Sequence, residues 1–358
     1  MRIYLRLLAA TTLAIALSIA LPVALSPFSQ TAEGRDDTNA VTTEADLLRW
    51  FDEFSNKGRW ENVGLGAANL ITPSKRRKAA ELVERGITVS MAHNVPQEPC
   101  SGPPATPGGP ATCLGDQDNT YLKRTVLNPQ MGPFISDKYE YQGTYHGSTH
   151  SHLDALGCHV HFEGEGWNDR DIEVTQEHGC PAEQGGITAV KDGVFTRGVL
   201  IDIARFRGVP WLEAGQGATG AEIRAWEKWS GVRIRSGDAI FLRTGRWKRQ
   251  AALGRPYQGG FPGWHASVIP LLHQRDVSYI GNDAINDVFP VGVATTRFIL
   301  PVHQIVMPSM GINIFDNLDL EAVGDLADRL GRYTFLLTAG PLRIDRGLGS
   351  PANPLATF

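Results

Sequence analysis

The densest group of chemically active side chains in the sequence is a run of histidines. Five of the chain's ten histidines fall within residues 145–162, YHGSTHSHLDALGCHVHF. His146, His150, His152 and Asp154 are separated from one another by even numbers of residues. In an extended strand such residues point to one face. We therefore predict a strand that presents three imidazoles and one carboxylate on a single side.

Three imidazoles and a carboxylate on one face favour a metal site. Nitrogen and oxygen ligands of this kind bind zinc, manganese or iron. The absence of a thiolate among these positions favours a hydrolytic ion over a soft metal. A histidine-rich surface without metal is the alternative interpretation. The next two histidines, His159 and His161, fall on the opposite parity, after a break that Gly157 can supply.

A strand alone rarely completes a metal shell, so further ligands must come from elsewhere in the chain. His303 and Asp316 are the candidates, thirteen residues apart in the sequence. Each has a structural alternative. Asp316 could instead cap the helix that we predict shortly after it.

The elements that must position these residues alternate between strand and helix patterns. Residues 198–206 and 237–245 read as short buried strands, and residues 219–231 between them as a helix that begins with a Thr219–Glu222 capping box. Such alternation predicts an α/β fold. Ahead of it, we predict helices capped by Thr43 and Thr72, the second ending at Gly86, and a strand over residues 87–95.

Composition limits the classes of partner. The 358 residues are 42% hydrophobic and 20% charged with a net charge of −4, which is ordinary for a globular chain. No basic stripe stands out, so we expect no nucleic acid partner. The N-terminus carries Arg2 and Arg6 followed by an apolar run over residues 7–25, typical of a secretory signal. We expect an exported protein, with no membrane contact unless this segment stays uncleaved as an anchor.

Export would permit disulfides among the four cysteines. Cys100 and Cys113 bracket a Pro/Gly-rich loop, and a bridge there would close it. By elimination, Cys158 would then pair with Cys180. Four free or partly paired thiols are the alternative.

Several separated motifs occur in an order that resembles the metal-dependent cyclase family, which includes bacterial kynurenine formamidases and isatin hydrolases. They are HGSTHSHLDALGCH, GEGWN, RGVLIDIAR, GDAIFLRTGRW, GNDAINDVFP, VHQIVMPSMGINIFDN and the terminal GSPANP. The resemblance implies a single swivelling β/β/α-type domain over residues 71–358. Residues 1–32 would then be a signal peptide or anchor, and residues 33–70 a linker and N-terminal helical arm.

The resemblance also implies roles for individual residues. His152 and Asp154 match the family's metal-binding pair, and His303 and Asp316 its distal ligands. Ser148 stands where the family has a further histidine, and His146 or His150 could substitute for it. Cys158 stands where the family has its general base, and His159 follows as though one residue had been inserted.

The resemblance implies a small-molecule hydrolase that holds one or two Mn²⁺ or Zn²⁺ ions and uses metal-activated water to cleave an amide, lactam, cyclic imide or lactone. His159 is the expected base, because imidazole titrates near neutrality, and His161 is the second choice. Trp167 and His265 are candidate substrate contacts, with ordinary packing as the alternative. A cyclase or dehydratase, or an exported binding protein without turnover, remains open. Homo-oligomers are common in the family and are expected here.

Overall fold

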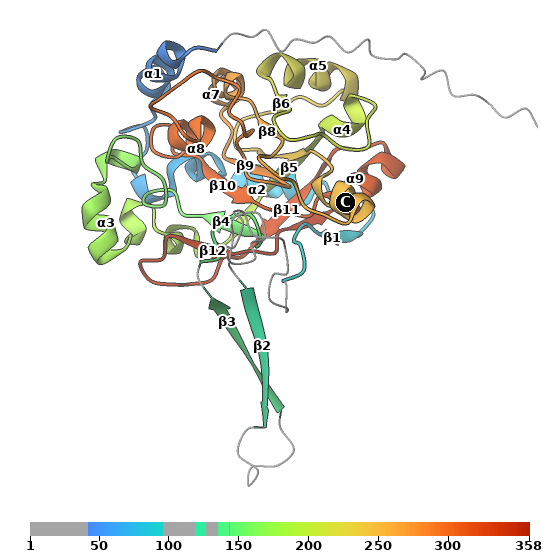
Figure 1. Ribbon diagram of the computed structural model, residues 1–358, viewed down its shortest axis with the longest axis horizontal. Coiled ribbons are helices and arrows are strands. Elements are labelled where there is room, and N and C mark those ends of the chain that lie inside the picture. Colours follow the sequence, from blue (N-terminus) through green and yellow to red (C-terminus); the bar gives the residue numbers. More distant parts are fainter. Residues whose placement is uncertain (1–41, 96–118, 127–134, 143) are drawn as a thin grey trace, which may run out of the picture. The chain divides into compact units, whose positions relative to one another are not determined.

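A nine-stranded mixed sheet forms the centre of the fold in the computed structural model, which describes residues 42–95, 119–126, 135–142 and 144–358 (Figure 1). Strands β5, β7, β9 and β10 pair in parallel, and the strands on either side of them are antiparallel. The spatial order is β1 (Thr88–Ser90), β13 (Leu355–Thr357), β11 (Thr334–Ala339), β5 (Val194–Asp202), β7 (Ala239–Arg243), β9 (Tyr279–Asn282), β10 (Asn313–Asp316), β4 (His152–Asp154) and β12 (Gly349–Pro351).

Two smaller sheets are described as well. Strands β2 (Asn119–Val126) and β3 (Ile135–Gln142) form an antiparallel pair, and β6 (Gly217–Ala218) pairs in parallel with β8 (Gly263–Trp264). The helices are α1 (Glu44–Glu53), α2 (Pro73–Ala80), α3 (Ile172–His178), α4 (Ile203–Phe206), α5 (Gly220–Ser230), α6 (Arg246–Leu253), α7 (Ile269–Arg275), α8 (Pro301–Val306) and α9 (Glu321–Leu330). Short 3₁₀ turns are η1 (Val63–Leu70), η3 (Trp167–Asp169), η4 (Ala182–Gln184), η5 (Ile187–Val190) and η6 (Ala266–Val268).

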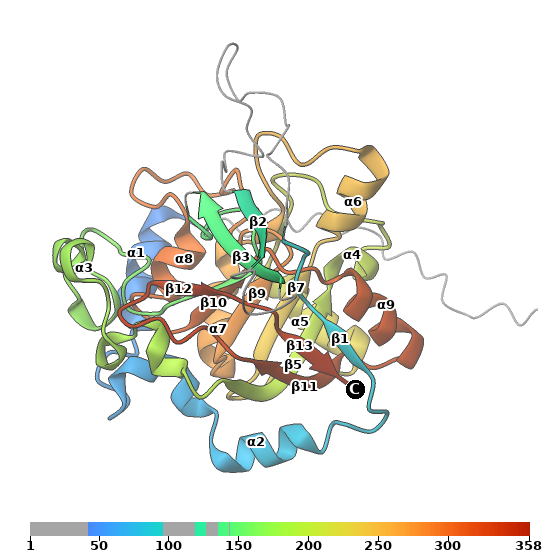
Figure 2. The same cartoon turned by 90° about the horizontal axis from the view of Figure 1, so that it is seen from below.

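The central strands are apolar because both of their faces are covered. Every residue of β7 and of β9 is buried. Helices α5, α7 and α8 lie on one side of the sheet in Figure 1, and α2 packs against β5 and β11 in the view of Figure 2. Parallel strands covered on both faces show such continuous apolar runs rather than alternation. The α/β class is therefore confirmed.

Most of the helix starts predicted from the sequence are confirmed. Thr43 and Thr219 each accept from the backbone N–H three residues on and complete a capping box, and Thr72 caps α2 with Pro73 in its first turn. The predicted C-terminal cap at Gly86 is wrong. The helix α2 ends at Ala80, six residues earlier, and turns follow it.

The predicted strand through the histidine run is also wrong in extent. Only His152–Asp154 forms a strand, and residues 147–150 are bends. Gly147 has a φ of 120°, which a strand residue does not adopt. His146 is therefore not placed by strand parity, although it reaches the same site by another path.

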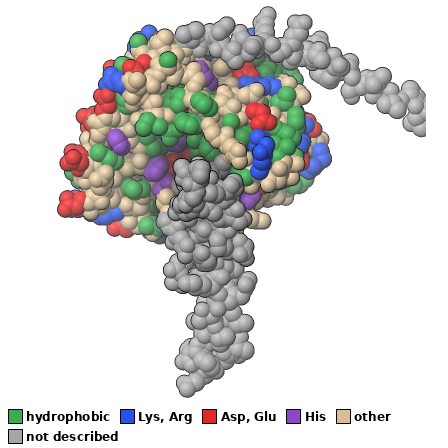
Figure 3. Space-filling view, viewed as in Figure 1, with side chains coloured by type: hydrophobic (Ala, Val, Ile, Leu, Met, Phe, Trp, Pro, Cys, Tyr) green, Lys and Arg blue, Asp and Glu red, His purple; other side chains and the backbone are tan. Residues whose placement is uncertain are grey.

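Some sequence predictions concern residues that the structure does not describe. The signal segment over residues 1–32 and the Cys100–Cys113 bridge lie outside the described residues. In the part of the chain that the structure describes, no helix is long and apolar enough to cross a bilayer. On the face drawn in Figure 3, the described Lys and Arg side chains are scattered rather than gathered into one patch.

Candidate metal centre

Asp154 lies at the centre of a buried cluster of histidines and carboxylates. Its Oδ1 is 2.8 Å from His146 Nδ1 and 3.4 Å from His152 Nε2, and its Oδ2 is 3.9 Å from His303 Nε2. His303 Nε2 also lies 3.2 Å from Asp316 Oδ2. Two sets of ligand atoms, His146–His152–Asp154 and Asp154–His303–Asp316, each fall within 4.8 Å of one another. Both sets contain Asp154.

Three neighbouring elements bring these side chains together. His152 and Asp154 lie two residues apart on β4 and therefore share a face. The antiparallel register between β4 and β10 places Asp316 directly opposite His152. His303 lies in the first turn of α8, which follows β9 in the chain. The predicted alternative role of Asp316 as a helix cap is wrong, since it ends β10 and α9 begins five residues later.

His146 does not belong to β4, and its ring reaches the cluster by packing against the neighbouring strand β12. Gly349 pairs with Asp154 across β12 and β4. A Cβ added to Gly349 would lie 2.7 Å from His146 Cε1. The ring of His146 therefore packs directly on the backbone of β12, where no larger residue would leave room for it. This gives a local reason for the glycine in the terminal GSPANP motif.

Backbone and carboxylate acceptors fix the orientation of two of the rings. His152 Nδ1 donates to the carbonyl of His150 at 2.7 Å, and His303 Nδ1 donates to Asp287 Oδ2 at 2.6 Å. In both residues this leaves Nε2 facing Asp154. Metal-binding histidines usually donate their second ring N–H in this way, which fixes the tautomer that offers a lone pair to the ion.

Asp287 holds the start of α8 as well as the ring of His303. Its Oδ1 accepts from the N–H of Val302 at 2.7 Å, and its Oδ2 accepts from the N–H of His303 at 3.1 Å. The carboxylate is 1% exposed. Asp287 was not recognised from the sequence, although it lies inside the GNDAINDVFP motif that supports the resemblance. Its neighbour Asn286 donates through its backbone and side chain to Asp316 Oδ1.

Replacing Asp287 by Asn is expected to weaken metal binding by about 10–100-fold. The amide can still cap α8 through its single oxygen, but it has no second acceptor for His303 Nδ1. Isothermal titration of Mn²⁺ or Zn²⁺ into the metal-free variant measures the effect. Asp276→Asn is the matched control and should bind as the wild type does, because this half-buried carboxylate lies at the end of α7 and pairs with Arg59. Equal affinity of Asp287→Asn and wild type would contradict this role.

The cluster has the properties of a cation site. Asp154 Oδ2 is buried and has no hydrogen-bond partner among the described residues. Such an atom is costly to bury unless something compensates its charge. Three imidazoles and two carboxylates supply the nitrogen and oxygen ligands that Zn²⁺ and Mn²⁺ accept. A divalent cation therefore fits the residues that the fold brings together.

Electrostatics in the metal-free chain point the same way. Burial disfavours the charged form of His152, but the attraction of Asp154 outweighs it and raises the pKa of His152 to about 9. Burial likewise opposes the charge on His303, yet Asp316 and Asp287 raise its pKa well above the usual value. Burial alone would raise the pKa of Asp154, but His159 and His152 hold it well below its usual range. Positive charge is thus stabilised here, as a bound cation requires.

His159 lies beside the cluster and is its most exposed member. Its ring stacks on His146 with the centroids 3.7 Å apart, and its Nε2 is 3.7 Å from Asp154 Oδ1. The side chain of His159 is 26% exposed, against 14% for His146 and 1% for His152. Burial lowers the pKa of His159 to about 4, although Asp154 favours its charged form. In the metal-free chain the ring is therefore neutral at neutral pH, and the expected titration near neutrality is not observed.

The remaining residues predicted for the site are not brought into it. His150 is buried and belongs to neither ligand set, and its carbonyl accepts from His152 Nδ1. His161 is exposed, and its Nδ1 accepts from the N–H of Gly164. Trp167 is 1% exposed and donates to the carbonyl of Val63, which supports the packing alternative.

His265 has a local structural role. It is the N-cap of η6, where its Nδ1 accepts from the N–H of Ser267. Its backbone N–H donates to the carbonyl of Ala218, which ties the cap to β6. Burial lowers the pKa of its ring. These contacts place it among residues that shape the fold rather than in the ligand cluster.

A buried arginine holds the loop between His146 and His152, and sequence reasoning missed it. Arg246 is 2% exposed, and its guanidinium donates to the carbonyl of Ser148, to Asn317 Oδ1 and to the carbonyl of Asp283. Asn317 in turn donates through its side chain to the carbonyl of Gly147. The bends at residues 147–150 are thus held by side chains and carbonyls that follow the ends of β7, β9 and β10, namely those of Arg246, Asp283 and Asn317. The motif GDAIFLRTGRW contained the signal, since an arginine directly after a buried strand needs acceptors.

Replacing Arg246 by Met is expected to lower the free energy of unfolding by about 2–4 kcal/mol, because several buried carbonyl and amide acceptors lose a charged donor. Urea denaturation followed by circular dichroism measures the change. The matched control is Lys248→Met on the exposed side of α6, which should change stability by about 0.5 kcal/mol or less. A loss no larger than that of the control would contradict the role of Arg246 in fixing the loop.

Comparison with known proteins identifies one family and several solved structures with the same fold. The model of the Cyclase family, described as "Putative cyclase", matches residues 79–286, more than half of the chain. A crystal structure described as a novel cyclase is 25% identical, with a TM-score of 0.66, covering 86% of this chain and 99% of that chain. No curated protein matches the chain.

Two isatin hydrolase structures share the fold at lower identity. One, bound to the product analogue thioisatinate, is 18% identical with a TM-score of 0.52, and the match covers 78% of this chain and 95% of that one. Isatin hydrolase A from Ralstonia solanacearum is 19% identical with a TM-score of 0.51, covering 80% and 97% of the two chains. The fold implied by the sequence motifs is therefore confirmed.

Proposed function

Because the chain belongs to the cyclase family, we propose that it is a metal-dependent hydrolase that cleaves a C–N bond in an amide, lactam or cyclic imide, or the corresponding ester bond of a lactone. The single observation that carries the proposal is the buried Asp154 carboxylate, which shares two sets of ligand atoms while its Oδ2 has no hydrogen-bond partner among the described residues. A structural carboxylate in a core would instead be satisfied by donors.

His146, His152, Asp154, His303 and Asp316 would hold the ion or ions, which we propose to be Mn²⁺ or Zn²⁺. When bound, such a cation would lower the pKa of its water to roughly 7 and would polarise a carbonyl under attack. Asp287 and the carbonyl of His150 keep the rings of His303 and His152 turned toward Asp154. The chain's own contribution is therefore a set of ligands whose orientations are fixed before substrate arrives.

His159 is the group that we propose to move the proton. It is neutral at neutral pH, it lies beside the ligands without being needed in either ligand set, and part of its ring reaches solvent. It can take a proton from water as the carbonyl is attacked and deliver that proton to the departing nitrogen. A departing amine needs such a proton, because it is otherwise a poor leaving group.

The substrate class follows from the chemistry of the site and from the named structures. Isatin is an aromatic lactam, and two of the structures that share this fold are isatin hydrolases. Cleavage of the C–N bond opens the ring of a lactam or cyclic imide, so both halves stay in one molecule. The product is then a single carboxylic acid whose mass exceeds that of the substrate by one water. We propose this class ahead of open-chain amides.

The proposal is tested with the metal-free chain, Mn²⁺ or Zn²⁺, and a panel of isatin, cyclic imides, N-formyl amides and lactones. Turnover that requires the metal and adds one water to the product mass is expected for at least one compound. A product formed with no change in mass, or with loss of water, would identify a cyclase or dehydratase instead. Tight metal binding without turnover across the panel would contradict the hydrolase.

We also propose that the chain works in an oxidising compartment outside the cytoplasm. The predicted Cys158–Cys180 bond is confirmed, and disulfides persist chiefly in such compartments. Immunodetection of the tagged full-length chain in separated cell fractions tests this location, and recovery only in the reduced cytoplasmic fraction would contradict it. The expected homo-oligomer stays a prediction.

A further inference from the structure

His159 lies at the end of a turn, and the next residue, Val160, packs against the hydrophobic core. The turn follows β4, and Gly157 N–H donates to the carbonyl of Gly185 at 3.0 Å. Residues 156–158 form this turn, and His159 lies in a bend directly after it. Among the described residues, the ring of His159 stacks on His146 and approaches Asp154. The covalent tie of its neighbour Cys158 adds to these contacts.

The residue directly before His159 is covalently tied to another segment. Cys158 is bonded to Cys180, 22 residues further on, with the two Cα atoms 5.8 Å apart. The two cysteines are 2% and 0% exposed. The bond therefore acts one residue away from the proposed base, inside the protein rather than on its surface.

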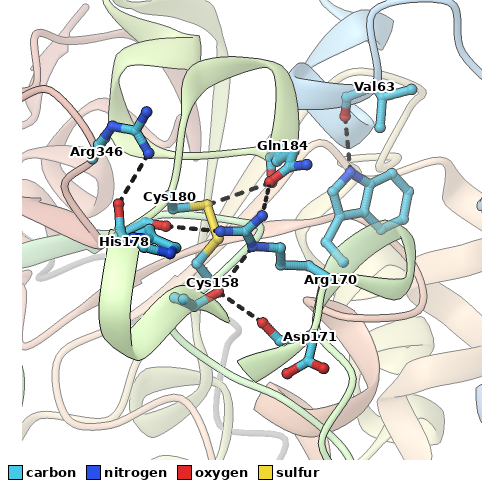
Figure 4. The surroundings of a disulfide bond; sticks show 11 residues. Val63, Cys158, Arg170, Asp171, His178, Cys180, Gln184 and Arg346 are labelled. Carbon is cyan, nitrogen blue, oxygen red and sulfur yellow. Dashed lines mark hydrogen bonds between the residues drawn. A yellow bond between two sulfur atoms is a disulfide. The ribbon is translucent and has the colours of Figure 1, made fainter. Parts of the chain in front are cut away.

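The segment on the far side of the bond is firmly held (Figure 4). Cys180 N–H donates to the carbonyl of Arg346 at 3.0 Å. The Arg346 guanidinium donates to the carbonyl of His178. Arg170 donates to Thr175 Oγ1, to the carbonyl of Gly179 and to Gln184 Oε1, so that it ties together both sides of the cysteine. Cys180 is thus a fixed point to which the turn is attached.

The two segments that the disulfide joins are also in close backbone contact. A Cβ added to Gly157 would lie 1.7 Å from the carbonyl oxygen of Gln184, and 3.2 Å from Cys180 Sγ. Gly185 has a φ of 89° and packs its Cα against the backbone of Gly157. The backbone contact at Gly157 and the disulfide together fix the turn relative to the segment of Cys180.

We propose that the Cys158–Cys180 disulfide is a positioning element for His159, so that its reduction lowers turnover while the metal ligands stay in place. The inference rests on the proposed function, in which His159 moves the proton. Reduction adds two electrons and two protons to the sulfur–sulfur bond and yields two thiols. A thiol or phosphine reductant supplies the electrons. Residues 158–161 then lose their only covalent tie to the segment of Cys180.

The kinetic test uses Cys158→Ser/Cys180→Ser with and without His159→Ala. Removing the bond should lower kcat by roughly 10- to 100-fold, since small displacements of a catalytic group cost up to about 10²-fold. KM and metal content should stay close to wild type. In the His159→Ala background, removing the bond should have no further effect on kcat. Equal losses in both backgrounds, no loss at all, or loss of metal would overturn the proposal.

Cys100→Ser/Cys113→Ser is the matched control, because it also leaves two cysteines in the chain. A loss of kcat in this control as large as in Cys158→Ser/Cys180→Ser would show that the effect is not specific to this bond. If Cys158→Ser/Cys180→Ser does not fold, the wild-type chain is measured instead before and after mild reduction by a phosphine.

A second readout does not depend on any substrate. The metal-free chain is treated with diethyl pyrocarbonate, and the modification rate of each histidine is followed by peptide mass spectrometry. His159 should react several-fold faster once the bond is removed, while His273 on α7 keeps its rate. An unchanged rate at His159 would overturn the inference. A faster rate in a chain that turns over no substrate would retain the inference and reject the proposed function.

Discussion

Replacing Asp154 by Asn is expected to lower kcat/KM by on the order of 10³-fold or more and to remove tight binding of Mn²⁺ or Zn²⁺. Asp154 is the one residue common to both ligand sets. The amide is neutral and offers only one oxygen, so it cannot replace a carboxylate that approaches His146 and His152 through one oxygen and His303 through the other. Loss of the cation would cost several kcal/mol of transition-state stabilisation, and about 4 kcal/mol corresponds to 10³-fold.

The matched control is Asp192→Asn, whose carboxylate is 90% exposed. It should keep wild-type activity and metal content. Metal analysis by mass spectrometry after desalting and steady-state kinetics on the best substrate of the panel measure the two effects. Wild-type metal content in Asp154→Asn would show that the buried carboxylate is not a ligand.

Replacing His159 by Asn is expected to lower kcat by about 10²–10⁴-fold while the metal content stays at the wild-type level. The reason is that His159 lies beside the ligands but in neither ligand set, so its loss should remove proton transfer and leave the ion in place. The substitution preserves polarity and most of the volume of the ring. Steady-state kinetics and metal analysis on the same sample separate the two effects.

His178→Asn, with a side chain that is 55% exposed at the end of α3, is the control for this second prediction. It should change kcat by less than the error of the measurement. Two results would contradict the assignment of His159. One is wild-type kcat in His159→Asn, and the other is a loss of metal as complete as in Asp154→Asn.

The sequence predicted the components of the site better than their geometry. The spacing of His152 and Asp154 correctly placed these two candidate ligands on one strand face, because that spacing is local and residues 152–154 do form a strand. The same argument failed for His146 and His150. The bends at residues 147–150 are imposed by Arg246, whose donors come from the far end of β7 and carry no periodic signal.

Contacts between distant residues could not be derived from periodicity. Asp316 meets His152 through the register of β10 with β4, and Asp287 meets His303 through the path of the chain from β9 to α8. The family resemblance named His303 and Asp316 but not the acceptor behind them. Conversely, the pairing of Cys158 with Cys180 followed from simple elimination and is confirmed.

The most direct test of the account is metal titration of the purified chain with product mass read on the same samples. We expect the metal-free chain to be inactive, Mn²⁺ or Zn²⁺ to restore turnover in proportion to bound metal, and the product to gain one water. Asp154→Asn should show neither binding nor turnover. Turnover of the same substrate by the metal-free chain, at a rate equal to that of the loaded chain, would contradict the account.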